Sequence, residues 1–150
     1  MRSSNRSRTL TTLLIGFFAL ACEPIVMIPG GRLSGTVTPA PEDWSFTDEV
    51  ETLQLETRPE DPYSVNVWGT AVGAHMYVAG AEVESGWVKN VLENPLVRLR
   101  VGEALYELQA IRTEAPEELE AFLVAAKNKY DFEPEPEQRE QATLFRLETR

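Results

Sequence analysis

Apolar and polar residues alternate in several short stretches after residue 50, and this period of two is typical of β-strands with one buried and one solvent-facing side. Residues 52–57 and 63–67 alternate in this way, and so does a later stretch around Phe145 and Leu147. Each stretch is therefore predicted to be a strand with one wet face.

Two β-hairpins are predicted where a glycine separates alternating stretches. Gly73-Ala74 lies between residues 68–72 and 75–78, and Gly102-Glu103 lies between residues 97–101 and 106–110. Glycine at the first position of a two-residue loop permits a tight reversal of the chain. The strands on either side of each glycine are therefore expected to pair antiparallel.

Two segments instead have the periodicity of helices. The first is predicted to start after Ser85, a good N-cap residue, and to stop at Asn94-Pro95; the second begins at Pro116, whose missing N–H costs nothing there. Their apolar stripes are Val88, Val91 and Leu92 in the first helix, and Leu119, Phe122, Leu123, Ala126 and Tyr130 in the second. A polar loop with several prolines is expected from Asp131 to Gln141.

Many antiparallel strands with few helices favour a mainly β fold, a closed or partly closed barrel with helices at its edges. Residues 49–150 have no repeat and no second block of composition, so they are predicted to be one domain. Residues 22–48 contain four prolines and are predicted to be an extended tether. Within them, residues 32–38 alternate enough to form a short edge strand or a strap across the domain.

The N-terminus has the order of a secretory signal. Three arginines, with no acidic residue, precede an apolar run over residues 10–20 and small residues around Ala21. This run is too short to cross a bilayer, which takes roughly 20 apolar residues. Residues 1–21 are therefore interpreted as a signal peptide that is removed.

The stretch FFALAC resembles the lipobox of bacterial lipoproteins, which ends in an obligatory cysteine. Cys22 is the only cysteine, so it has no disulfide partner within the chain, and thioether lipidation explains both its position and its solitude. An ordinary signal cleaved near Ala21, which leaves a free thiol, is the alternative. Lipidation predicts a protein anchored in the bacterial cell envelope, facing the periplasm or the outer surface.

The charge of the processed chain excludes one class of partner. Loss of residues 1–21 removes three of the 14 basic residues and none of the 24 acidic ones, which leaves a formal net charge of −13. Such a surface repels nucleic acid, so nucleic-acid binding is not expected.

Three segments together resemble the split β-barrel flavoproteins, which include pyridoxamine-phosphate oxidase-like proteins and deazaflavin-dependent nitro- and quinone reductases. They are ETRPEDPYSVNVWG at 56–69, WVKNVLENPLVRLRVG at 87–102 and ATLFRLE at 142–148. The resemblance implies a six-stranded antiparallel split barrel with two flanking helices, which forms a homodimer. It also implies FMN or a deazaflavin in the groove between subunits.

The resemblance also indicates which residues would hold such a cofactor. Its phosphate would need cations, and its ring would stack on tryptophan; the candidates are Arg58, Lys89, Arg98 and Arg100 for the phosphate and Trp68 and Trp87 for the ring. As alternatives, Arg98 and Arg100 form a solvated face neutralised by neighbours such as Glu107, and both tryptophans close a core.

One segment opposes a cofactor. Where cofactor-binding members supply Ser, Thr, Lys or Arg, this chain has Glu82 and Glu84, whose carboxylates would repel a phosphate. The sequence contains no Ser-His-Asp arrangement and indicates no catalytic residue. His75 has no partner at metal-ligand spacing, so no metal site is expected.

Two functions remain open at this point. In the first, the protein binds FMN or a deazaflavin and reduces small electrophiles, with the cofactor carrying the chemistry. In the second, it is a non-enzymatic envelope lipoprotein that uses the barrel as a binding or scaffolding module.

Overall fold

The computed structural model describes residues 30–80 and 85–150. The predicted signal peptide, Cys22 and the Glu82/Glu84 pair lie outside these residues. Among the helices that the structure describes, none has both the length and the hydrophobicity needed to span a bilayer.

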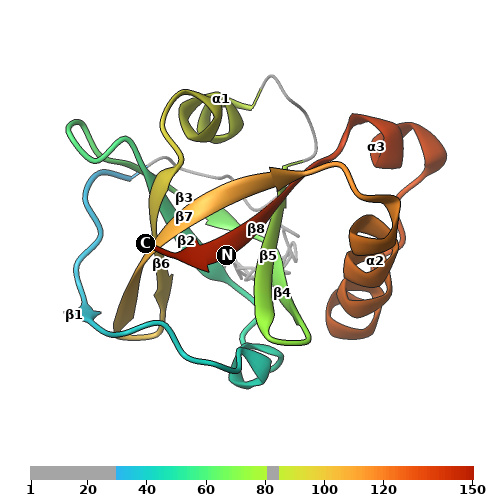
Figure 1. The fold of residues 1–150 in the computed structure, drawn as a ribbon, viewed down its shortest axis with the longest axis horizontal. Helices are drawn as coiled ribbons and strands as arrows, with labels where there is room; N and C mark the ends of the chain where they lie inside the picture. Colours follow the sequence, from blue (N-terminus) through green and yellow to red (C-terminus); the bar gives the residue numbers. More distant parts are fainter. Residues whose placement is uncertain (1–29, 81–84) are drawn as a thin grey trace, which may run out of the picture.

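The domain is built on one curled antiparallel sheet (Figure 1). Seven strands form its path, in the spatial order β3-β2-β6-β7-β8-β5-β4. In chain order they are β2 (Leu53–Thr57), β3 (Tyr63–Val67), β4 (Gly69–Val72), β5 (His75–Gly80), β6 (Leu96–Val101), β7 (Ala104–Thr113) and β8 (Thr143–Thr149). The short strand β1 (Thr36–Val37) lies off this path and pairs parallel with β7.

The connection between β3 and β4 explains why the sheet curls. These strands are at opposite ends of the path, yet only Trp68 separates them in the chain. The two edges of the sheet must therefore approach one another at Trp68. The result is a split barrel, with its division at the joint between β3 and β4.

Both predicted hairpins are confirmed, β4–β5 and β6–β7, and the glycines at their turns have positive φ angles of 59° at Gly73 and 58° at Gly102. Both predicted helices are also present, as α1 (Gly86–Glu93) and α2 (Pro116–Tyr130). Ser85 does hold the N-cap position of α1, but its side chain makes no capping hydrogen bond.

The predicted counts of six strands and two helices are wrong, because residues 30–80 and 85–150 contain eight strands and three α-helices. β1 adds one strand, and the break at Trp68 divides another into β3 and β4. The third helix, α3 (Pro136–Gln141), replaces part of the loop predicted from Asp131 to Gln141. It forms because Glu135 and Gln138 make a reciprocal capping box at its start.

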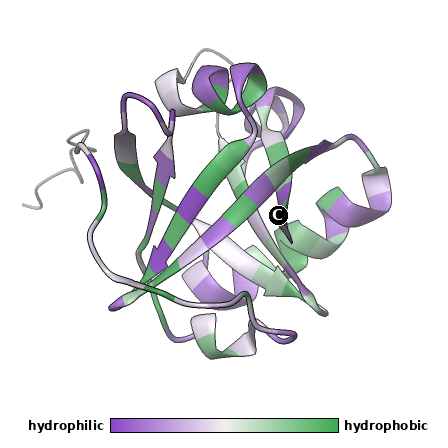
Figure 2. Ribbon diagram, turned by 60° about the vertical axis from the view of Figure 1, so that its left-hand side comes forward, coloured by the Kyte–Doolittle hydropathy of each residue, from purple (hydrophilic) through white to green (hydrophobic). Residues whose placement is uncertain are grey.

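Hydrophobic residues from both hairpins fill the interior of the barrel, and Figure 2 shows their alternation with hydrophilic residues along the long strands. Trp44 closes the interior from the segment before β2, next to the short 3-10 helix η1 (Ser45–Thr47). A second, smaller cluster lies between the sheet and α2; it consists of Tyr77, Phe122, Ala126 and Leu144.

Residues 30–38 form a strap along the barrel wall. Gly30 bridges to Ser64 on β3, and Thr36 and Thr38 donate backbone hydrogen bonds to carbonyls of residues 103 and 105. The strap explains an error in the sequence prediction. β2 was predicted to have a wet face, but Glu56 on that face is 3% exposed, because the strap covers it.

Candidate functional site

The six predicted site residues have different environments in the structure. Arg98 and Arg100 lie on β6 and bind the strap. Arg98 donates to both oxygens of Glu56, at 2.9 and 2.6 Å, and to the Leu33 carbonyl at 3.2 Å, while Arg100 donates to the Ser34 carbonyl at 3.2 Å. The arginines thus have partners in the wall of the barrel.

The acidic neighbour that neutralises Arg98 in the structure is not the one named in the alternative interpretation. Glu107 forms an ion pair with Arg150, at 2.8 Å, and the carboxylate that neutralises Arg98 is Glu56. The Arg98 side chain is only 16% exposed, so the face is not a solvated one.

Arg58 and Lys89 lie at the end of the barrel that α1 covers. Arg58 follows Thr57, whose hydroxyl accepts a hydrogen bond of 3.0 Å from Asn90 of α1. Its guanidinium lies 5.4 Å from the centre of the Tyr63 ring and pairs with Asp61 at 3.2 Å, while its Nε is buried without a partner. Lys89 is exposed on α1, next to Asn90.

The two tryptophans have opposite environments. Trp87 is 4% exposed and packs 5.8 Å from the Phe145 ring, so it closes the core as the alternative interpretation predicted. Trp68 is 46% exposed, so it does not close the core. The sequence pattern of the two residues did not distinguish them, because Trp68 lies at the joint between the edges of the sheet.

Trp68 forms one wall of an apolar groove of about 150 Å³ between the β4–β5 hairpin and the helices α2 and α3. Its indole stacks on Tyr130, with ring centres 5.2 Å apart and planes at 15°, and meets Phe132 edge-on at 5.0 Å. The rest of the lining is Ala79, Gly80, Leu119, Phe122, Leu123, Ala126, Pro134, Gln138, Arg139 and Ala142.

The polar atoms at the groove are held by partners. Tyr130 donates from its hydroxyl to the Gly69 carbonyl at 2.8 Å, and Lys129 donates to the same oxygen at 2.8 Å. Burial raises the pKa of Tyr130 and lowers the pKa of Lys129. At the other side, Arg139 forms an ion pair with Glu120 at 2.6 Å, which links α3 to α2.

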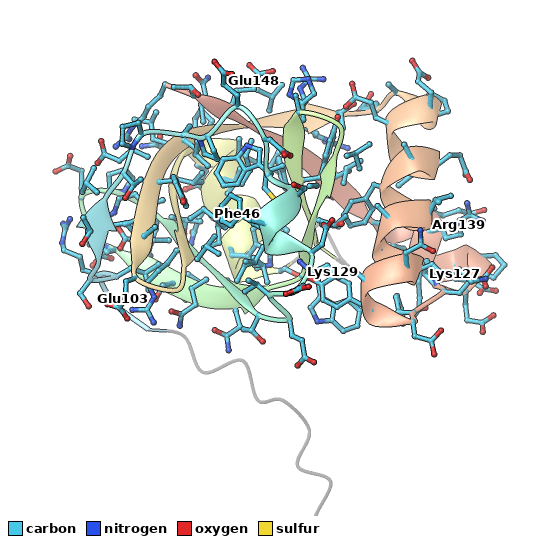
Figure 3. The ribbon with its side chains drawn as sticks, turned by 90° about the horizontal axis from the view of Figure 1, so that it is seen from below. Phe46, Glu103, Lys127, Lys129, Arg139 and Glu148 are labelled. Carbon is cyan, nitrogen blue, oxygen red and sulfur yellow. The ribbon has the colours of Figure 1, made fainter. Side chains whose placement is uncertain are left out.

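Figure 3 shows Lys127, Lys129 and Arg139 together at the α2–α3 end of the molecule, far from Glu103 at the β6–β7 turn. The groove thus combines an exposed aromatic surface with an apolar floor and charged residues at its margin. Such a site suits a small, flat, apolar ring.

Sequence reasoning missed most of this groove. Tyr130 was assigned to the stripe of α2, which is correct, but nothing indicated that its ring would meet Trp68. Phe132 follows Asp131, which ends α2 with a φ of 51°, and this reversal directs Phe132 to the groove. The wall from α3 could have been found from the capping-box residues Glu135 and Gln138.

Comparison with known proteins gives one family match. Residues 69–141, from β4 to the end of α3, match the F420H(2)-dependent quinone reductase family. No curated protein matches the sequence significantly.

Solved structures with the same fold share little sequence with this chain. A conserved hypothetical protein from Mycobacterium tuberculosis is 19% identical, with a TM-score of 0.58 over 70% of this chain and 76% of that one. A NimC/NimA family protein from Clostridium acetobutylicum is 14% identical, with a TM-score of 0.51 over 67% and 73%. A protein named F420 reductase is 18% identical, with a TM-score of 0.50 over 72% and 94%. These likenesses support the split-barrel fold alone.

Proposed function

We propose that this split-barrel protein, which resembles the deazaflavin-dependent quinone and nitro reductases, binds a deazaflavin or FMN and reduces a small planar electrophile. The observation that carries the proposal is the groove beside Trp68, because its lining residues other than Trp68 and Ala142 belong to the segment that matches the quinone reductase family. An exposed tryptophan stacked on a second ring is a surface to which a flat ligand can add.

The size of the groove limits what it can hold. Sites for whole drug-sized ligands occupy roughly 300–1,000 Å³, whereas this groove has about 150 Å³. It therefore suits one small ring system, and the remainder of a cofactor would lie outside it. The residues that would contact the ring are Trp68 and Phe132.

When bound, a reduced deazaflavin or flavin supplies a hydride, and the protein supplies position and surroundings. The apolar side chains of α2 would exclude water from the face of the ring opposite Trp68. Arg139, the charged residue in the lining of the groove, is paired with Glu120, so the lining offers no unpaired charge, which favours a neutral electrophile over a charged one.

Of the four cations considered for the phosphate, Arg58 and Lys89 are the better candidates. Arg58 has a buried Nε without a partner and an ion pair only with Asp61, which is 84% exposed. Arg98 is unsuitable because Glu56 accepts two hydrogen bonds from it inside the wall.

In this proposal the protein acts as a homodimer, anchored through lipidated Cys22 in the cell envelope.

The second candidate is a non-enzymatic lipoprotein that uses the barrel as a binding module. The commitment of Arg98 to Glu56 and of Arg100 to the strap favours it, because it reduces the number of cations that can hold a phosphate.

Titration of the purified protein with coenzyme F420 and with FMN, followed by absorbance, separates the two candidates. We expect uptake of one cofactor and reduction of menadione by its reduced form. Trp68→Leu should weaken binding of the cofactor about threefold to tenfold through loss of the stack. Val124→Ala is the matched control, because Val124 is 61% exposed on α2 and does not line the groove. A protein that takes up neither cofactor would contradict the reductase proposal and support the binding module.

A further inference from the structure

The joint between β3 and β4 is the place where the two edges of the sheet meet, and Trp68 is its single residue. Because Trp68 is also the exposed wall of the groove, the conformation of this joint decides where its indole points. What holds the joint therefore determines the shape of the site.

The backbone of Gly69 is held by side chains at the end of α2. β4 ends the path of the sheet, so its outer edge has no neighbouring strand along that path. The Tyr130 hydroxyl accepts a hydrogen bond from the Gly69 N–H at 3.1 Å and donates one to the Gly69 carbonyl at 2.8 Å. Lys129 gives that carbonyl a second donor, at 2.8 Å. Tyr130 thus satisfies both polar groups of an edge residue, as a paired strand would.

Position 69 also has no room for a side chain. A Cβ at this position would lie 2.7 Å from Cε of Met76, 2.8 Å from the Tyr77 carbonyl oxygen and 3.0 Å from Cδ1 of Leu53. Gly69 therefore has β5 as its neighbour on one side, where only a glycine fits, and is bound by Tyr130 on the other.

The same Tyr130 ring stacks on Trp68, with centres 5.2 Å apart. One side chain thus holds both the backbone of the joint and the indole next to it. We propose that Tyr130 is a positioning residue, whose hydroxyl, by binding Gly69, keeps Trp68 in the orientation that receives a flat ring. That the groove receives a ligand rests on the proposed function, whereas the claim that Tyr130 orients Trp68 does not.

The buried hydroxyl suits this role at neutral pH. Desolvation raises the pKa of Tyr130, so the hydroxyl keeps its proton and can donate to the Gly69 carbonyl while it accepts from the N–H.

Tryptophan fluorescence can test the inference without any ligand. Of the three tryptophans, Trp44 and Trp87 are 3% and 4% exposed, whereas Trp68 is 46% exposed. Acrylamide therefore quenches mainly Trp68, and loss of this quenching in Trp68→Phe would verify the assignment. Tyr130→Phe keeps the ring and removes only the hydroxyl.

The matched control is Tyr77→Phe. The Tyr77 hydroxyl donates to Glu118, at 3.2 Å, near the other end of α2. Only the backbone of Tyr77 lies near Gly69, and Tyr77→Phe does not change it. We expect Tyr130→Phe to change the acrylamide quenching and the emission maximum of Trp68 in the folded protein, and Tyr77→Phe to leave both unchanged. Affinity for the cofactor that the wild-type protein takes up, measured by the same emission, should fall about threefold in Tyr130→Phe.

Several results would overturn the inference. They are an unchanged Trp68 signal in Tyr130→Phe, an equal change in Tyr77→Phe, or unfolding of Tyr130→Phe in circular dichroism, which would make the hydroxyl a general stabiliser. Failure of the wild-type protein to bind any ring ligand would contradict the proposed function alone, because the quenching comparison does not depend on a ligand.

Discussion

Glu56 is a buried carboxylate that connects three parts of the fold. It is 3% exposed, accepts two hydrogen bonds from Arg98, at 2.9 and 2.6 Å, and a third from the Leu33 N–H at 2.5 Å. It therefore joins β2, β6 and the strap through a single side chain. Removing one partner of a buried ion pair leaves the other charge without compensation.

We expect Glu56→Ala to lower the free energy of unfolding by about 3–5 kcal/mol, because the Arg98 guanidinium would be left in the wall of the barrel. Urea denaturation measures this change. Glu120→Ala is the control, since Glu120 and its partner Arg139 are 65% and 40% exposed, and its loss should cost less than about 1 kcal/mol. Similar costs for the two variants would mean that Arg98 finds water or another acceptor when Glu56 is absent.

Among the elements, α2 shows how far a periodic pattern reaches. Its predicted stripe does face the sheet, where Phe122 and Ala126 are each 6% exposed, and Val124 between them is 61% exposed. Its ends are held by polar contacts that no periodicity predicts. Glu118 accepts a hydrogen bond from Arg146 of β8 at 2.6 Å at one end, and Tyr130 binds Gly69 at the other.

Phe122→Ala should lower the free energy of unfolding by about 3–5 kcal/mol, because it removes a large side chain from a small cluster that cannot refill the space. The control is Val124→Ala, on the same helix but in solvent, for which we expect a change within about 0.5 kcal/mol. Thermal or chemical denaturation of both variants measures the difference. A cost for Phe122→Ala below about 1 kcal/mol would indicate that α2 rests loosely on the sheet.

For the whole molecule, the proposed attachment to a membrane would depend on Cys22, which precedes the strap. We expect the full-length protein, expressed in a bacterium, to fractionate with membranes and Cys22→Ser to move it to the soluble fraction, because an acyl chain contributes roughly 0.8 kcal/mol per buried CH₂. Mass spectrometry of the wild-type N-terminal peptide would identify the lipid. Equal fractionation of both proteins would favour the ordinary signal peptide.

The amino-acid sequence by itself determined the local elements. The alternation of residues 52–57 and 97–110, the glycines at 73 and 102, and the helical stripes each act over a few neighbouring residues, so they appear correctly in the structure. The mainly β, barrel-like fold followed from their order. Resemblance of three segments then indicated the split-barrel group, which the match over residues 69–141 supports.

Only the tertiary structure decided which residues from different elements are neighbours and which are buried. It buried Glu56 under the strap, bound Arg98 and Arg100 to the strap, exposed Trp68 while it buried Trp87, and brought Tyr130 and Phe132 next to Trp68. These outcomes depend on contacts between residues far apart in the sequence, such as the bond from Tyr130 to Gly69, which spans 61 positions. Periodicity describes which face of an element is apolar, but the partner of that face is set by the way in which the sheet curls.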